Sequence, residues 1–177
     1  MKPDRAGGGR ARAVEPSAGA RGLALDNPDY AYACQRVTAG AAGRPAEQWA
    51  REVFEGAPQP LRGLIVAGWI TVLRLRLSRP RSSPGHVLGW EIISATPFAA
   101  VFGVTSAALT ARLVVQVEGD AVTHSTFLRY DRPYGKVLWA LSEPVHRAVI
   151  PYLLNRAARG VATPNGEADR RLRSRRR

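Results

Sequence analysis

The longest apolar run of the chain, LIVAGWITVLRLRL at residues 64–77, has the spacing of an amphipathic helix. Its uncharged part, between Arg62 and Arg74, is eleven residues long, whereas a helix needs about 20 apolar residues to cross a bilayer. The pattern therefore predicts a helix of the core, covered on most sides, rather than a membrane span. Its apolar face, at three- and four-residue steps, consists of Leu61, Leu64, Ile65, Gly68, Trp69, Val72 and Leu73.

Two further segments have helical spacing, and five have the composition of β-strands. A short helix is expected at residues 44–58, where Pro45 suits the first turn and Gly56 with Pro58 ends it. A long helix is expected at residues 132–160. The expected strands cover residues 30–38, 87–95, 98–106, 109–117 and 121–130.

The last two strands form a predicted hairpin, because Gly119 and Asp120 between them suit a tight two-residue turn. Pairing Glu118 with Ala121 fixes the register, and side chains then alternate between two faces. The more apolar face contains His124 and is predicted to be the buried one. Its other members are Leu109, Ala111, Leu113, Val115, Val117, Val122, Thr126, Leu128 and Tyr130.

The long C-terminal helix carries a continuous apolar stripe and two prolines. Pro144 and Pro151 cannot donate the helical hydrogen bond, so we expect a break near Ser142, which would act as a cap, and a kink before Pro151. The stripe predicts the buried face of this helix. It consists of Val137, Leu138, Leu141, Val145, Ala148, Val149, Tyr152 and Leu153.

The order of elements predicts an α+β fold, with two short helices after the first strand, then antiparallel strands, then the long helix. An antiparallel sheet needs a cover on one face, and only the last helix is long enough to lie across it. A curved sheet that grips a helix in this way generally leaves an apolar cleft between the two layers. We therefore expect a helix-grip architecture with a cleft between the sheet and the C-terminal helix.

The segment TFLRYDRPYGKVLWALSEPVHRAVIPYLLNRA, residues 126–157, resembles the C-terminal signature of the bacterial domain of unknown function 2867. The matching residues are Arg129, Gly135, Pro144, His146 and Arg147. QWAREVFEGAP and HVLGW look like the variant common in actinobacteria, and the resemblance covers most of residues 28–158. That family is similar to the START/Bet v 1-like, polyketide-cyclase-like proteins (SRPBCC or helix-grip proteins). The resemblance implies six or seven strands and a cleft for hydrophobic ligands, and it transfers no catalytic residue.

Charge divides the chain into a domain and two ends. The net charge is +12, and 24 of the 26 basic residues are arginine. The basic excess lies mainly in the ends, which contain little to bury and are predicted to be disordered. We expect a disordered basic extension at residues 1–24, a single domain at 25–160 and a disordered arginine-rich tail at 161–177. A single cysteine, Cys34, excludes an internal disulfide, and without a secretion signal a cytoplasmic location is expected.

The predicted cleft supplies the candidate ligand-binding residues. His124 and Tyr130 would orient the polar end of a hydrophobic small molecule or lipid. The alternative for His124 is a buried histidine that a neighbouring hydroxyl satisfies. The walls would come from Leu113, Val115, His124, Thr126, Leu128, Tyr130, Leu141, Val145, Val149 and Tyr152.

Two residues of the last helix, His146 and Arg147, are candidates for contact with an anionic group. The alternative is a structural tie between this helix and the sheet. The histidines, of which His86 is the third, lack the spacing of metal ligands. No metal site and no cofactor are therefore expected.

Two other functions stay open. One is a cyclase- or dehydratase-type enzyme in which His124 would act as general acid or base and Tyr130 as proton donor. The other is an interaction protein recruited to nucleic acid or to an anionic membrane by its C-terminal arginines. These are Arg170, Arg171, Arg173, Arg175, Arg176 and Arg177.

Overall fold

The computed structural model describes residues 9–78 and 82–162 and contains one seven-stranded antiparallel sheet and four α-helices in that part of the chain. In chain order the elements are β1 (Arg12–Val14), α1 (Ala18–Gly22), β2 (Tyr30–Val37), the 3-10 helix η1 (Ala41–Gly43), α2 (Ala46–Phe54), α3 (Gln59–Thr71), β3 (His86–Val87), β4 (Trp90–Ala95), β5 (Ala99–Thr105), β6 (Leu109–Glu118), β7 (Ala121–Tyr130) and α4 (Pro133–Ala162).

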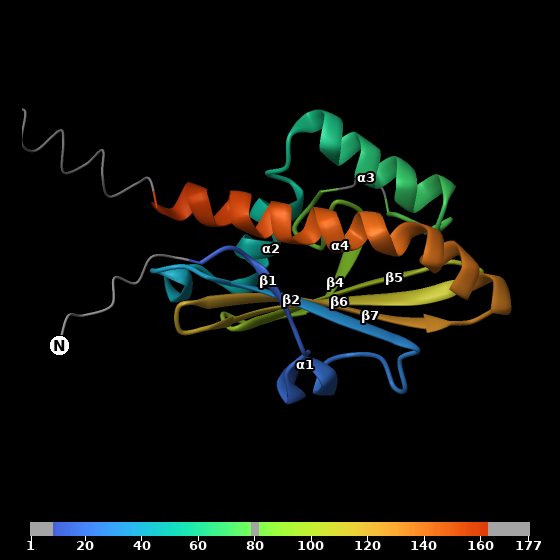
Figure 1. Ribbon diagram of the computed structural model, residues 1–177, viewed down its shortest axis with the longest axis horizontal. Coiled ribbons are helices and arrows are strands. Elements are labelled where there is room, and N and C mark those ends of the chain that lie inside the picture. The colour runs from blue at the N-terminus through green and yellow to red at the C-terminus, as the bar shows by residue number, and fades with distance from the viewer. Residues whose placement is uncertain (1–8, 79–81, 163–177) are drawn as a thin grey trace, which may run out of the picture.

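The sheet has the strand order β1-β2-β7-β6-β5-β4-β3. Helices α2, α3 and α4 lie on one side of it and α1 lies on the other (Figure 1). The predicted α+β class is confirmed, and the antiparallel sheet with a long C-terminal helix is consistent with a helix-grip-like fold.

The hairpin between β6 and β7 has the predicted register. Glu118 pairs with Ala121, and Val115 pairs with His124. Gly119 in the turn has a φ of 56°, a left-handed conformation that glycine adopts at little cost. Strand β2 pairs with the other edge of β7 and places Cys34 opposite His124. The histidine is therefore fully buried at the centre of the sheet.

Residues 9–24 contain ordered structure where the composition predicts disorder, and that part of the prediction is wrong. The Ser17 side chain caps α1 by accepting a hydrogen bond from the backbone N–H of Ala20. The same hydroxyl donates to Gln116 Oε1 on β6 at 2.9 Å. Ala20 is fully buried and packs with Phe127 in a small second core on the outer face of the sheet. A short helix with one small buried residue gives a weak sequence signal, which is why the pattern missed it.

The expected strand count of five is also too low. Strands β1 and β3 span only three and two residues, which is too short for a recognisable alternation. The predicted disorder of residues 1–8 and 163–177 lies outside the described residues. Helix α4 ends at Ala162, close to the expected end of the domain at residue 160.

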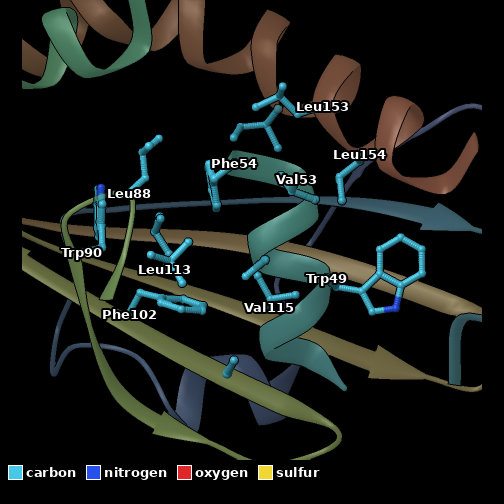
Figure 2. Packing of buried hydrophobic residues seen from close by; sticks show 14 of the residues in the cluster. Trp49, Val53, Phe54, Leu88, Trp90, Phe102, Leu113, Val115, Leu153 and Leu154 are labelled. Atoms are coloured by element: carbon cyan, nitrogen blue, oxygen red, sulfur yellow. The ribbon is translucent and has the colours of Figure 1, made fainter. Parts of the chain in front are cut away.

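The main core lies between the sheet and α2. Trp49, Val53 and Phe54 of α2 are buried against the sheet, and Leu153 and Leu154 of α4 pack on the same cluster (Figure 2). The indole N–H of Trp49 donates to the carbonyl of Ala41 at 3.0 Å. Helix α2 therefore fills space that the sequence pattern assigns to a cleft.

Helix α4 is continuous, so the predicted break at Ser142 is wrong. Pro144 and Pro151 both lie inside it. Each proline leaves a carbonyl four residues earlier without its helical donor, and these carbonyls belong to Ala140 and Arg147, which are exposed and accessible to water. The Ser142 hydroxyl donates to the Leu138 carbonyl at 3.1 Å instead of capping a new helix.

The predicted apolar stripe of α4 is only partly buried: Leu153 is buried and Leu138 and Val149 pack against the core, whereas the other five positions are exposed. Leu141 is 68% exposed and Val145 is 58% exposed. The helix packs on an adjacent face instead. That buried face consists of Trp139, Ile150, Leu153, Leu154, Ala157 and Ala158.

Helix α3 is likewise a surface helix rather than the expected core helix. Val66 is its one buried residue, and Leu64 is 65% exposed. In the ranges 9–78 and 82–162, no helix combines the length and apolar character needed to cross a bilayer.

A candidate ligand groove between α3 and α4

The apolar face of α3 forms one wall of a groove of about 360 Å³ between α3 and α4. The spacing of this face is as the sequence predicts, but the face lines the groove and not a closed core. The groove residues on this side are Leu61, Leu64, Ile65, Gly68 and Trp69 of α3, together with Val72 and Leu73 directly after the helix.

Contacts at both ends hold α3 above the rest of the molecule. At its start, the Arg62 side chain donates to the Glu55 carbonyl at 2.9 Å. After its end, the backbone N–H of Arg76 donates to the Thr105 carbonyl of β5 at 2.9 Å. Between these points Trp69 packs edge-on against Trp90, with ring centroids 5.4 Å apart. The apolar face between the anchors stays open to the groove.

Helix α4 supplies the opposite wall. Its side chains at three- and four-residue steps face the groove, among them one imidazole and one hydroxyl. The lining residues are Trp139, Leu141, Ser142, Val145, His146 and Val149.

The imidazole of His146 connects this groove to the core. Its Nε2 lies 3.1 Å from the Thr126 hydroxyl on β7. Its ring packs against Trp139 at 5.1 Å and Tyr32 at 5.8 Å between centroids. His124, on the same strand as Thr126, is the next ring inward, at 6.2 Å.

Both imidazoles are neutral at pH 7. Burial lowers the pKa of His124 to about 4. Burial also lowers the pKa of His146 well below its ordinary value, and repulsion from His124, when that ring is protonated, and from the Arg147 cation lowers it further. No groove residue among those described is charged at neutral pH.

Arg147, the other anion-contact candidate, lies outside the groove. Its guanidinium sits over the Tyr32 ring, 5.0 Å from the centroid, and its Nε donates to Glu143 at 2.8 Å. The structure therefore separates the two candidates, with His146 in the groove and Arg147 engaged on the neighbouring face.

Several buried polar atoms near the groove have no hydrogen-bond partner among the described residues. These are Nε1 of Trp139, which lines the groove, and both ring nitrogens of His124 behind it. An unpaired buried donor is costly to the fold, and these three atoms are buried rather than exposed on the surface of the groove.

The ten predicted wall residues fall into three groups. Leu141, Val145 and Val149 line the groove. Tyr130 is half-buried against the core, and Tyr152 is exposed. The other five are buried in the packed layer between sheet and helices, namely Leu113, Val115, His124, Thr126 and Leu128.

The α3 wall is the part of the site that the sequence did not assign. The sequence does show a periodic apolar face at residues 61–73. That pattern alone predicts packing in the core and does not distinguish it from the wall of a groove. Within the described part of the chain, no group of three or more His, Cys, Asp or Glu side chains is placed to hold a metal ion.

Comparisons with known proteins add no relative: no protein-family model matches the chain, and no curated protein is significantly similar to it. The resemblance to the domain of unknown function 2867 stays a prediction. The geometry of the groove is therefore the main basis for a functional argument.

Proposed function

We propose that the chain binds an uncharged hydrophobic small molecule or lipid in the groove between α3 and α4. The observation that carries the proposal is a groove of about 360 Å³ with apolar walls on two helices and a few polar atoms at one place. Ligand sites in proteins have volumes of about 300–1,000 Å³ and this same mixture of apolar walls and sparse polar groups.

The preference for an uncharged ligand follows from the lining. A carboxylate or phosphate moved into the groove would lose its hydration without meeting a cationic partner among the described residues. A carbonyl, ester or hydroxyl oxygen needs only an uncharged polar neighbour, such as Ser142 on the α4 wall. Neutral His146 on the same wall adds a polar contact without adding charge.

We also propose that the domain is related to the START/Bet v 1-like helix-grip proteins and acts in the cytoplasm. The strand order and the long C-terminal helix support this relationship. In this proposal the ligand site differs from a cleft between sheet and C-terminal helix, because Trp49, Val53 and Phe54 of α2 occupy that layer.

A cyclase- or dehydratase-type reaction has less support. His124 and Tyr130 lie six residues apart on one strand, which separates their Cα atoms by about 20 Å. His124 is also fully buried. A single small substrate would not reach both side chains.

The test uses a groove-filling substitution. A Cβ added at Gly68 meets no atom within 4 Å, so Gly68→Leu should fill the groove without a clash. Gly63→Leu is the matched control, because Gly63 lies on the same helix, has equal space and does not line the groove. Binding of lauryl alcohol and of laurate to the full chain is followed by intrinsic tryptophan fluorescence, to which Trp69 and Trp139 of the groove contribute.

We expect lauryl alcohol to bind the wild type and Gly63→Leu, and to bind Gly68→Leu at least tenfold more weakly. Laurate should bind the wild type more weakly than the alcohol does. Equal binding of the alcohol to both variants would place the ligand elsewhere, and no binding by the wild type would remove the proposed function.

A further inference from the structure

One face of α4 is apolar and exposed over most of the helix. We call this face the outer stripe, and it contains Tyr134, Val137, Leu141, Val145, Ala148 and Tyr152. These positions repeat at three- and four-residue steps, so they share one side of the helix. The stripe spans the 19 residues from Tyr134 to Tyr152, or about 27 Å at the helical rise.

The exposure of this stripe is large. Val137 is 60% exposed and Tyr134 is 49% exposed, and neither lines the groove. Across the groove, Leu64 of α3 is 65% exposed. Contiguous exposed apolar surface of this kind marks an interaction site, and ligand binding in the groove does not account for Tyr134, Val137 and Tyr152.

The charges on the same two helices indicate the nature of the partner. Helices α3 and α4 contain one acidic residue, Glu143, and five basic residues. The sequence after Ala162 adds six arginines at residues 170–177. The five basic residues of the helices are Arg62, Lys136, Arg147, Arg156 and Arg159.

We propose that the outer stripe docks the protein on the surface of an anionic lipid membrane. An exposed apolar helix face with basic residues nearby lies in the plane of the bilayer interface, with its apolar side chains among the lipid headgroups and upper acyl chains. The basic residues of the two helices are attracted to anionic lipid. Lipid thus covers the apolar area and neutralises the charge.

A second copy of the chain fits the same surface less well. Two copies joined through the outer stripe would bring two basic helix pairs together, and like charges at close range oppose association. A nucleic acid would pair with the arginines but would leave the apolar stripe in water. An anionic membrane satisfies both features of the surface, the apolar stripe and the excess of basic residues.

Membrane docking would also place the groove where a lipid ligand is found. Leu141 and Val145 belong to the outer stripe and to the groove wall, so the groove opens beside the docking face. A lipid ligand could then pass between the bilayer and the groove. This transfer rests on the proposed function. The docking itself does not.

The experiment is co-sedimentation of the full chain with vesicles of phosphatidylcholine, with and without phosphatidylglycerol. The stripe variant is Val137→Glu/Tyr152→Glu, which leaves the groove residues intact. The control is Ile93→Glu/Phe98→Glu, which adds the same charge at exposed apolar positions of the sheet region, 45% and 70% exposed. Circular dichroism and lauryl alcohol binding are measured on both variants.

We expect the wild type and the control to bind the phosphatidylglycerol vesicles, and the stripe variant to bind at least tenfold more weakly with unchanged alcohol binding. Equal vesicle binding by the stripe variant and the control would overturn the proposal. A dimer of the wild type that the stripe variant abolishes would also overturn it, in favour of a second copy. If the wild type binds the vesicles but does not bind lauryl alcohol, the proposed function is wrong and the membrane docking stands.

Discussion

The side chains of Thr126 and His146 meet at 3.1 Å between Oγ1 and Nε2, and so connect the centre of the sheet to the middle of α4. Thr126 is buried, and the contact gives its hydroxyl a hydrogen-bond partner in a layer that is mostly apolar. A threonine in the middle of the sheet thereby fixes the imidazole that lines the groove.

Replacing Thr126 with valine should destabilise the protein by about 1–2 kcal/mol, because it removes this hydrogen bond and leaves a buried imidazole nitrogen unpaired. Urea unfolding measures the change. A double-mutant cycle with His146→Phe should show coupling between the two sites, and additive effects would argue that the contact contributes nothing.

Stability should fall as the pH is lowered from about 6.5 towards 4. The pKa of His124 in the folded protein is lowered to about 4 from an ordinary value of 6.5, so in this window the unfolded chain binds a proton that the folded chain does not. The linkage gives a loss of up to about 1.4 kcal/mol per pH unit for each such histidine. His146, whose pKa is lowered in the same direction, adds to the effect.

Urea unfolding at a series of pH values tests this prediction. His124→Leu should reduce the slope of stability against pH between 6.5 and 4, because it removes one of the two titrating groups. A wild-type stability that stays flat across this window would contradict the assignment of neutral buried imidazoles.

Gly135, at the start of α4, should not tolerate a side chain. A Cβ there would lie 2.4 Å from the backbone carbonyl oxygen of Ala108, so Gly135→Ala should cost about 1–3 kcal/mol through overpacking. Gly160→Ala is the control in the same helix, because its Cβ would meet no atom within 4 Å. The control should be neutral or slightly stabilising, and similar thermal midpoints for the two variants would refute the close approach.

The docking of α1 on the outer face can be tested with Ala20→Asp. Burying a carboxylate beside Phe127 should cost about 2–4 kcal/mol or detach α1 from the sheet. Ala18→Asp is the control, because Ala18 is exposed in the first turn of the same helix, where a negative charge is favourable. Amide exchange of β6 and β7 should increase only in Ala20→Asp, and equal protection in both variants would mean that α1 does not stabilise the sheet.

The local parts of the fold could be predicted from the sequence because their signals are local. The hairpin follows from alternation and a two-residue turn, which predict the pairing of Val115 with His124 without any tertiary contact. The burial of His124 follows from the same register. These features need only neighbouring residues in the chain.

The location of the candidate site could not be predicted in this way. An apolar stripe shows that a helix face prefers to leave water, but it does not show which element covers that face. Trp49 and Phe54 of α2 cover the sheet, and the stripes of α3 and α4 that contain Leu64 and Leu141 remain exposed. Which of the three helices covers the sheet depends on how the side chains pack together. The periodicity of each helix taken by itself does not contain that information.

The brevity of β1 and β3 has a consequence for the behaviour of the protein in concentrated solution. Strands of three and two residues lie at the two ends of the sheet order, so they offer short templates for an incoming strand of another molecule. Short edge strands are one of the means by which proteins resist edge-to-edge aggregation. Self-association of this chain is therefore expected to begin at the exposed helices rather than at the sheet, and amyloid-like stacking of the native fold is disfavoured.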